Sequence, residues 1–526
     1  MHDQKFSQCS GADAVGLARN PGTGESSLNL GMEEYLGIVQ HQAKPLVIPL
    51  CAELPLPDLS PLELFSSLKK SYGYLLESIE GSEKIARYSY IGTDLELLVT
   101  PGESTRLVGK EPYISIAKNP QGENAIDQIR SILQRFNFVN VNAPRFFGGL
   151  VGYLSYDLVY SLNKPILKST KPVSDLPLAQ FMMTNDCIVF DHRDKKMFIF
   201  CSPLLTYDTD STEEYAKSRD RILAIREEIT RLENARERKV LRSSPEERPL
   251  RCSEIMSKED FLQAVTRVKE YISAGDIFQA VLSRNIEVDF TQDPFSLYRA
   301  LRDINPSPYM YYLDFGNLQV IGASPEMLVR VEKRKVTTVP IAGTRLRGTT
   351  PEEDEELAHE LLADEKERAE HTMLVDLARN DVGRVCKFGS VRVEDFMNIE
   401  RFSHVQHIVS TVHGSLQDNL DGFEALKSCF PAGTVSGAPK IRAMQIIDEV
   451  EPDQRGLYAG AVGYMGFDRN LEFAITIRTI IAHNRKASVR VGAGIVADSV
   501  PENEWLETEN KARAMVKAIE LAERYP

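Results

Sequence analysis

Short apolar runs separated by turn-forming residues dominate the chain from about Val39 to Phe200. Two of these runs, at residues 45–50 and 187–190, are rich in Val, Ile, Leu and Phe and are bounded by Pro or Asp. Runs of this kind are typical of β-strands. The pattern therefore predicts a strand-rich unit with interspersed helices in the first half of the chain.

Helical periodicity is clearer further along the chain. Residues 215–232 place apolar side chains on one face and charged side chains on the other, which predicts an amphipathic helix. Residues 258–274 repeat the pattern, and Ser257 with Asp260 indicates a capping box at the start. After this helix we expect Val- and Ile-rich strands to alternate with long helices.

Polar stretches divide the chain into four segments. Residues 1–34 are rich in Gly, Ser and Asn, a composition that buries little surface, and we exclude this tail from the fold. Residues 233–251 are almost wholly charged or polar and contain prolines, which indicates a linker. We therefore expect an N-terminal domain at 38–232 and a second domain at 252–526.

Two glycine-rich segments, residues 148–157 and 460–468, are similar to each other. The similarity suggests two equivalent strands that meet in one core. A chance likeness between glycine-rich strands explains it equally well.

Bulk composition excludes several classes of protein. At 526 residues, with 42% hydrophobic and 26% charged residues, the chain has the composition of a folded globular protein with more than one unit. It has no apolar run long enough for a membrane helix and no secretory signal pattern, so we expect a cytoplasmic protein. A net charge of −14 without a basic block argues against nucleic acid as a partner. The seven cysteines show no paired spacing and are expected to be reduced thiols.

A helix is expected to begin at Thr350 and Pro351, because a capping hydroxyl, a proline in the first turn and the acids that follow all favour a helix N-terminus. An apolar stripe continues this helix to Ala378. Glu370 points along the stripe, and Glu367 lies one turn earlier on nearly the same face. A carboxylate on a buried face needs a cation. The alternative is a pair of surface acids held by neighbouring basic residues.

The last helix, expected to begin near Ser499, repeats this arrangement. Glu504, Glu507 and Lys511 are three and four residues apart, so they share one face. They could hold Mg²⁺ together with a substrate carboxylate, because Mg²⁺ takes one or two protein carboxylates and completes its shell with water and ligand. An ordinary Glu507–Lys511 helix pair explains the spacing as well.

Two glycine segments and one histidine add to this pattern. Residues 430–440 lead into a helix, whose N-terminus can receive an anion, although no Ser or Thr follows a Gly-Lys pair as in a Walker A loop. Residues 491–495 follow a strand and let a ligand approach the main chain. Each segment is equally consistent with a structural turn. His407 is a candidate acid catalyst, although a single histidine is more often structural. Together these residue types favour an enzyme that binds an anion and a metal.

Eight segments occur in a characteristic order: Gly275-Asp-Ile-Phe-Gln279, Asn305-Pro-Ser-Pro-Tyr-Met-Tyr311, Ala323-Ser-Pro-Glu326, Pro340-Ile-Ala-Gly-Thr-Arg345, Asp364-Glu-Lys-Glu-Arg-Ala-Glu-His371, Met373-Leu-Val-Asp-Leu-Ala-Arg-Asn-Asp381, Thr434-Val-Ser-Gly-Ala-Pro-Lys440 and Gly492-Ala-Gly-Ile495 with Asn510-Lys511. In this order they resemble the chorismate-utilising enzymes, and most closely the large-subunit (component I) family of anthranilate synthases. The resemblance extends from about residue 40 to the end of the chain, and its specificity outweighs the structural alternatives above.

The resemblance implies a fold, a cofactor and a set of contacts. The implied fold is α+β, a large compound β-sandwich with helices packed on its outer faces. The implied cofactor is Mg²⁺, with Glu370 and Glu507 as direct ligands and Glu367 and Glu504 as neighbouring acids that bind the metal's waters. Chorismate is implied to contact Gly343, Thr344, Thr434, Tyr458, Arg478, Gly492, Ala493, Gly494 and Lys511.

Two positions distinguish the branches of the family. Isochorismate-forming relatives carry a lysine base where this chain has Gln279, and glutamine cannot deprotonate water. Aminodeoxychorismate synthases typically carry a lysine where this chain has Ala342. Ammonia is therefore the expected nucleophile and anthranilate with pyruvate the expected products.

For the reaction, we expect His407 or Glu326 to protonate the departing C4 hydroxyl after ammonia adds at C2. A carboxylate base, for which Glu367 is the candidate, would then take the C2 proton as pyruvate leaves. An enzyme that stops at 2-amino-2-deoxyisochorismate, an aminodeoxychorismate synthase and a non-catalytic tryptophan or chorismate sensor remain alternatives.

Regulation and partners are also implied by the resemblance. Leu75-Leu-Glu-Ser78 resembles the family's feedback element, in which Ser78 and the turn Pro308-Tyr309-Met310 clasp tryptophan. Such inhibition requires coupling between two distinct sites. No Gly-x-Cys-x-Gly nucleophile segment occurs. We therefore expect a separate glutamine amidotransferase subunit that supplies ammonia, in a heterotetramer of two large and two small subunits.

Overall fold

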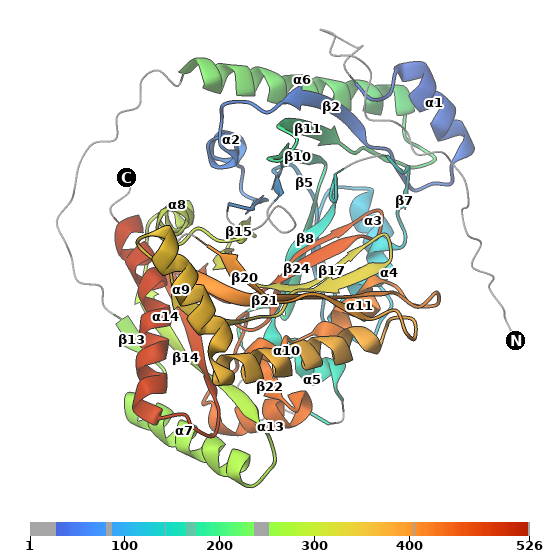
Figure 1. Ribbon diagram of the computed structural model, residues 1–526. Coiled ribbons are helices and arrows are strands. Elements are labelled where there is room, and N and C mark those ends of the chain that lie inside the picture. The colour runs from blue at the N-terminus through green and yellow to red at the C-terminus, as the bar shows by residue number, and fades with distance from the viewer. Residues whose placement is uncertain are drawn as a thin grey trace, which may run out of the picture.

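The computed structural model describes residues 28–79, 87–141, 144–164, 166–167, 169, 171, 174–235, 252–402 and 405–523. Two β-sheets pack face to face, and helices cover their outer faces (Figure 1). Within these residues, twelve strands form the first sheet, eleven form the second and three short strands form a third. The expected α+β fold, a compound β-sandwich with outer helices, is confirmed.

The strand order in each sheet is as follows. The first sheet runs β13 (Cys252–Glu254), β14 (Gln279–Asp289), β26 (Lys486–Ile495), β25 (Thr479–His483), β16 (Leu318–Ser324), β15 (Tyr309–Asp314), β3 (Gly73–Glu77), β4 (Tyr88–Gly92), β10 (Asp186–Asp191), β11 (Lys196–Cys201) and β2 (Leu50–Pro55), with β22 (Gly437–Ala438) paired to β14. The second runs β19 (Ile341–Leu346), β21 (Val405–Ser415), β18 (Lys335–Thr338), β17 (Met327–Glu332), β24 (Leu471–Ile475), β23 (Ala461–Gly466), β8 (Gly149–Leu154), β9 (Ala179–Thr184), β5 (Leu95–Thr100) and β6 (Arg106–Gly109), with β20 (Arg392–Arg401) paired to β21. The third runs β12 (Leu204–Leu205), β1 (Leu46–Val47) and β7 (Asn137–Phe138).

Helices cover the two outer faces. On the first sheet lie α1 (Met32–His41), α2 (Pro61–Leu68), α6 (Ser211–Ala235), α7 (Lys258–Ser273), α8 (Pro294–Ile304) and α14 (Pro501–Ala522). Associated with the second are α3 (Tyr113–Ala117), α4 (Ala125–Leu133), the short turns η2 (Tyr156–Leu158) and α5 (Val159–Leu162), α9 (Pro351–Ala363), α10 (Glu365–Gly383) and α11 (Gly422–Cys429). The helices α12 (Gly433–Ser436) and α13 (Lys440–Val450) contact β14 and β22 of the first sheet. None of the helices within the described residues has the length and apolar composition that crossing a membrane requires.

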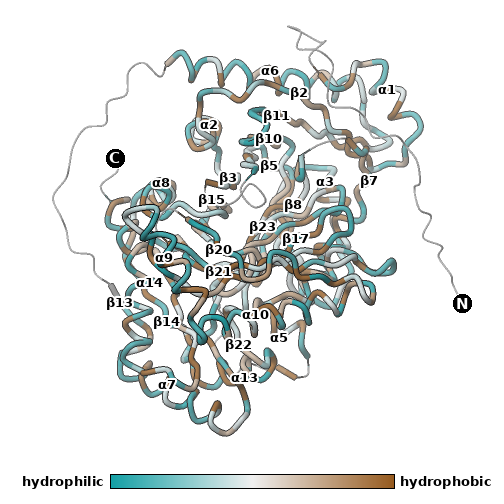
Figure 2. Tube along the Cα trace, in the orientation of Figure 1, coloured by the Kyte–Doolittle hydropathy of each residue, from teal (hydrophilic) through white to brown (hydrophobic). Residues whose placement is uncertain are grey.

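Apolar side chains fill three layers. An aromatic cluster that includes Tyr74, Tyr90, Phe146, Tyr153 and Tyr464 lies between the sheets. Of the two larger clusters, one lies between the first sheet and its helices and the other between the second sheet and its helices. Figure 2 shows the same division, with apolar residues along the inner strands and mixed polarity on the outer helices. Burial on both faces therefore explains why most strands are continuous apolar runs.

The two halves of the chain share both sheets. In the first sheet β3 pairs with β15, and in the second β8 pairs with β23. The latter pair joins the two similar glycine-rich segments, with Gly152 opposite Gly463, so the expected meeting of two equivalent strands is confirmed. The division into domains at 38–232 and 252–526 stays a prediction, and the shared sheets mean that these segments do not have separate cores.

The chain ends differ from expectation on one point. Residues 1–27 of the predicted tail and residues 236–251 of the predicted linker lie outside the described residues. The excluded tail is shorter than predicted, because Leu28 and Leu30 are buried and Asn29 accepts a hydrogen bond of 2.8 Å from the Cys51 amide. Two leucines in a polar stretch give little sequence signal, yet they extend the core.

Two local features of the second half of the chain also differ from the expected ones. The helix expected to run from Pro351 to Ala378 breaks at Asp364, whose carboxylate caps α10 through the amides of Lys366 and Glu367. Glu367 and Glu370 therefore lie in the first turns of a new helix. Residues 491–495 lie inside strand β26 and do not follow a strand.

Candidate active site

A cavity of about 240 Å³ is lined by residues of β14, β19, β21 and β26 and of the helices α10, α12 and α14. The sequence-predicted residues that line it are Gln279, Glu326, Gly343, Thr344, Glu370, His407, Thr434, Tyr458, Arg478, Gly492, Gly494 and Lys511. They come from seven elements and the loops between them. The structure therefore brings together residues that are far apart in the sequence.

Glycines bring backbone to the wall of this cavity. A Cβ at Gly492 would lie 2.5 Å from the Tyr458 hydroxyl, and one at Gly494 would lie 2.7 Å from the Gln279 side-chain nitrogen. Side chains at these positions would fill the space, so glycine is required there. Ala493 is buried in the apolar cluster beside α7 and α13, so its side chain does not line the cavity. Ala493 can offer only its backbone to a ligand.

Glu326 is a buried carboxyl in this wall. Burial raises its pKa to about 8, although the Thr434 hydroxyl and the positive charge of Arg478 lower it. Glu326 is therefore protonated near neutral pH. A carboxylic acid in this state can donate a proton to a leaving group.

His407 is also buried, on β21, and burial lowers its pKa. Its Nδ1–H donates to the Gly343 carbonyl oxygen over 2.7 Å, and the Thr344 hydroxyl lies 3.1 Å from the same nitrogen. This hydrogen bond fixes the tautomer, so the other ring nitrogen of the neutral ring is an acceptor. The Phe402 ring packs edge-on against the imidazole at 5.5 Å.

Arg478 and Gln279 have unused hydrogen-bonding capacity. Among the described residues Arg478 has no salt bridge, and burial lowers the pKa of its guanidinium. Its backbone has a left-handed φ of 51°, an uncommon conformation for arginine. The buried Gln279 Oε1 also lacks a hydrogen-bond partner in the part of the chain described. Such groups are costly to bury unless a ligand completes their hydrogen bonds.

The four predicted metal-site acids lie at the starts of α10 and α14. Burial and the charges of Glu367 and Glu507 raise the pKa of Glu370. Burial and the charge of Glu507 likewise raise the pKa of Glu504. Lys511 forms an ion pair of 2.6 Å with Glu507 and donates to the Gly492 carbonyl oxygen over 3.0 Å. The neighbouring carboxylates thus repel one another, and the positive charge of Lys511 offsets this repulsion only in part.

This donor set fits a hard cation only with added ligands. Within the described residues no group of three or more His, Cys, Asp or Glu side chains is placed to hold an ion. Mg²⁺ does not need such a group, because it commonly takes one or two carboxylates and keeps water or substrate oxygens. A cation bound beside Glu370 and Glu504 would lower the pKa values that burial and the neighbouring acids raise.

Neighbouring contacts fix α10 against the sheet. His371 Nε2 and the Ser410 hydroxyl are 2.7 Å apart, and Arg345 forms an ion pair of 3.0 Å with Asp364 and one of 3.5 Å with Glu367. These contacts place Glu367 beside Gly343, where a Cβ would lie 3.1 Å from the Glu367 carboxylate. The acidic pair on α10 therefore reaches the rim of the cavity.

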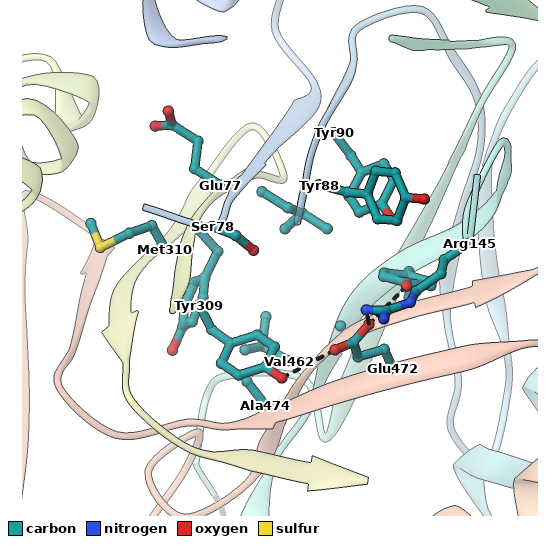
Figure 3. Close-up of a pocket in the computed structure, with 14 residues that line it drawn as sticks. Glu77, Ser78, Tyr88, Tyr90, Arg145, Tyr309, Met310, Val462, Glu472 and Ala474 are labelled. Atoms are coloured by element: carbon teal, nitrogen blue, oxygen red, sulfur yellow. Dashed lines mark hydrogen bonds and ion pairs between the residues drawn. The ribbon is translucent and has the colours of Figure 1, made fainter. Parts of the chain in front are cut away.

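A second, smaller cavity of about 50 Å³ lies between the sheets (Figure 3). Ser78, Tyr309 and Met310 line it, as do Tyr88, Tyr90, Arg145, Tyr464 and Glu472. Pro308 is buried immediately before Tyr309. The predicted tryptophan-binding residues therefore lie at one place, away from the first cavity.

The charged groups in the second cavity are already paired. Glu472 accepts hydrogen bonds from Tyr309 at 3.1 Å and Tyr464 at 3.0 Å, and its carboxylate lies 3.8 Å from Arg145 (Figure 3). Glu77 accepts from Tyr298 at 2.5 Å and from Arg302 at 3.0 Å. The walls are otherwise aromatic and apolar.

Two backbone connections join the cavities. Tyr309 on β15 pairs with Ser324 on β16, two residues before Glu326. The amide of Ile475, beside Ala474 of the second cavity, donates to the Glu326 carbonyl oxygen over 3.0 Å. A shift of either strand therefore reaches Glu326.

Comparison with known proteins agrees with this geometry. The family model described as "chorismate binding enzyme" matches residues 77–517. The chain is 48% identical to anthranilate synthase component 1 of Acetivibrio thermocellus, over 90% of this chain and 96% of the relative. It is 44% identical to the protein of the same name from Aquifex aeolicus, over 94% and 99% of the two chains. The chain belongs to the family of chorismate binding enzymes.

Solved structures of chorismate binding enzymes have the same fold. The anthranilate synthase component I structure from Streptococcus pneumoniae aligns with a TM-score of 0.65 at 34% identity, covering 88% of this chain and 98% of that one. The menaquinone-specific isochorismate synthase of Escherichia coli aligns with a TM-score of 0.62 at 18% identity, over 92% and 98%, and shows likeness of fold alone.

Sequence reasoning missed some residues in the cavity of this chorismate binding enzyme. Arg490 lines the wall, and its guanidinium pairs with Asp453 at 2.5 Å and donates to the Gln454 carbonyl oxygen at 2.7 Å. Val281 and Met515 line it too. Arg490 lies two residues before Gly492 on the same strand, so period-two alternation was the available signal.

Proposed function

We propose that this chain is the chorismate-binding component of an anthranilate synthase, which converts chorismate and ammonia to anthranilate and pyruvate. The observation that carries the proposal is the buried carboxyl of Glu326 in one cavity with Arg478, a cation without a salt bridge among the described residues. An acid and an unpaired cation suit a dianionic substrate that must lose a hydroxyl. The likeness to proteins named anthranilate synthase component 1 supports this choice.

Substrate binding follows from charge. Arg478 would form a bidentate pair with the carboxylate of the enolpyruvyl arm, assisted by the Tyr458 hydroxyl. Lys511 would contact the ring carboxylate, and Gly343, Thr344, Thr434 and the 492–494 backbone would enclose the ring. Tyr458 remains a neutral donor, because burial raises its pKa to about 12.

The acid in this proposal is Glu326. As ammonia adds at C2, the Glu326 proton moves to the C4 oxygen, and the C4–O bond breaks to release water. Neutral His407 has its Nδ1–H committed to Gly343, so it serves better as an acceptor that orients the substrate than as the acid. The free Oε1 of Gln279 would accept an N–H of ammonia and orient it.

In the second step the Glu367 carboxylate takes the C2 proton, the C3–O bond breaks and the ring becomes aromatic. The side chain leaves as the enolate of pyruvate, whose methylene carbon then takes up a proton to give pyruvate. The proposed cofactor is Mg²⁺ at Glu370 and Glu507, with Glu367 and Glu504 beside its waters. When bound, the ion supplies positive charge for a substrate carboxylate. This classes the enzyme as a Mg²⁺-dependent carbon–oxygen lyase.

Feedback inhibition by tryptophan at the second cavity is part of the proposal. Ser78, Tyr309 and Met310 would hold the amino acid among the aromatic walls. A cavity of about 50 Å³ has room for only a few waters. Tryptophan must therefore displace its walls, and the strands that lead to Glu326 give such a displacement a route to the active site.

The relatives' name, component 1, supports a second component that supplies ammonia from glutamine. We propose a glutamine amidotransferase as this partner, in an assembly of two large and two small subunits.

The test is incubation of the purified chain with chorismate, Mg²⁺ and ammonium, monitored by anthranilate fluorescence. Chelation by EDTA and Glu507→Gln should each abolish most of the signal. Chorismate consumption without fluorescence would indicate that the reaction stops at an aminated, non-aromatic product. No consumption would favour a sensor.

A further inference from the structure

Arg284 is a fully buried cation that the reaction described above does not use. Its guanidinium lies 4.0 Å from the centre of the Trp505 ring, and its Nε–H donates to the Thr508 hydroxyl over 2.8 Å. It also forms ion pairs with Glu509 and, at 3.1 Å, with Glu254. Three of these four contacts lie on α14.

The contacted residues occupy one face of α14. At 100° per residue, Trp505, Thr508 and Glu509 lie close together around the helix axis. Glu504, Glu507 and Lys511 form the next stripe, about a third of a turn away by the same spacing. Arg284 thus contacts the face of α14 that lies next to the face with Glu504 and Glu507.

Rotation of α14 determines where its carboxylates lie. Side-chain tips are roughly 5 Å from a helix axis, so a rotation of about 10° moves them by about 1 Å. Displacements of this size can lower the rate by about 100-fold in an active site. The N-cap residue of α14, Val500, has no side-chain capping bond, so the first turn depends on other contacts.

Arg284 lies on a strand that also lines the cavity. It lies on β14, whose register places Ser283 opposite Gly492 and Val281 opposite Gly494. In Figure 1, α14 and α7 lie beside β14 at one corner of the molecule. The Phe261 ring of α7 packs edge-on against the Trp505 ring, with the ring centres 5.6 Å apart. The arginine therefore links the helix to the strand pair that carries the glycine wall.

We infer that Arg284 is a positioning residue that fixes the rotation of α14 and so aims Glu504, Glu507 and Lys511 at the cavity. The inference rests on the proposed Mg²⁺ site. The planar guanidinium of Arg284 stacks on Trp505 while it donates to Thr508, a combination that lysine cannot reproduce.

The variant Arg284→Met is expected to fold. The carboxylates that lose their partner, Glu254 and Glu509, are 37% and 44% exposed, so water can solvate them. Arg284→Lys keeps the charge but loses the stacked fork. Ile519→Ala on the same helix is the matched control, because it weakens the apolar packing of α14 four turns from Glu504.

The experiment measures Mn²⁺ binding by electron paramagnetic resonance and Mg²⁺ binding by calorimetry, with chorismate present and ammonium absent. Melting temperatures are recorded for every variant. Arg284→Met should raise the dissociation constant of the ion about 10-fold or more, Arg284→Lys should fall between it and wild type, and Ile519→Ala should bind as wild type.

Wild-type metal affinity in Arg284→Met would overturn the inference. Equal loss of affinity in Arg284→Met and Ile519→Ala, in proportion to their melting temperatures, would show a merely structural role and also overturn it. A wild-type chain that binds neither ion and turns over chorismate in EDTA would instead overturn the proposed metal site. These results are distinguishable.

Discussion

The two cavities of this chain treat charge in opposite ways. In the substrate cavity, Arg478 has no salt bridge within the described residues, and Glu370 has its pKa raised by burial and neighbouring acids. In the second cavity, Glu472 is already paired with Arg145 and two tyrosines. The first cavity is suited to charged ligands, whereas the second offers aromatic walls with paired charges.

The difference indicates how each cavity selects its ligand. Unpaired charges give strong interactions with an ion or dianion, because the partner removes a burial penalty. Paired charges add little, so shape and ring contacts must discriminate. Substitutions should therefore act by different mechanisms and on different quantities in the two cavities.

The largest effect is expected for Glu326→Gln. Loss of the proposed acid should lower kcat by about 10²–10⁴-fold, because general acid catalysis contributes that much. Tryptophan affinity, measured by calorimetry, should stay near wild type. In the wild type, kcat/KM should fall as pH rises through about 8, where Glu326 loses its proton. Near-normal turnover in the variant would remove Glu326 from the mechanism.

A smaller effect is expected for Glu504→Gln. This acid is assigned to the metal's waters, so its loss should raise the Mg²⁺ concentration needed for half-maximal rate by about 10–100-fold. The rate at saturating Mg²⁺ should recover most of the wild-type value. A lowered maximal rate with unchanged Mg²⁺ dependence would mean that Glu504 acts elsewhere.

In the second cavity, Ser78→Ala or Met310→Ala should weaken tryptophan inhibition by about 10-fold, because each removes a contact worth roughly 1.4 kcal/mol. Uninhibited turnover should stay within about 2-fold of wild type, since neither residue lines the substrate cavity. Inhibition curves with increasing tryptophan provide the measurement. Unchanged inhibition in both variants would refute the assignment of this cavity.

The smallest effect concerns stability and pH. The folded pKa of Glu326, about 8, lies above its ordinary value of 4.5, so the folded chain retains a proton that the unfolded chain releases. Its contribution to stability therefore falls as pH rises between these values. Glu326→Gln cannot ionise, so its melting temperature relative to wild type should increase by about 4 °C from pH 5 to pH 8.5. The surface variant Glu352→Gln should show no such trend.

Local features were predictable from the sequence. The capping residues Ser257 and Thr350 mark the helix starts, and Pro351 and Pro501 follow the expected first-turn pattern. Such signals depend on neighbours in the chain. The helix break at Asp364 was missed because the apolar stripe of the sequence continues across this residue. The Asp364 carboxylate caps α10 and so determines where the new helix begins.

Long-range features were less predictable. The roles of Glu326 and Arg478 came from resemblance, because no local pattern shows that they meet in one cavity. Arg490 had the local signal of its spacing from Gly492, but its partner Asp453 belongs to a distant loop that this spacing does not indicate. Sheet pairing across the whole chain determines these positions.

That pairing has a consequence for how the protein must be made. The strands β23 to β26, residues 461–495, join the strands of both sheets, and they are synthesised after β8 and β16, with which β23 and β25 pair. Until then β8 and β16 expose apolar faces and unpaired edges. A chain released before residue 495 should therefore aggregate rather than yield a working half.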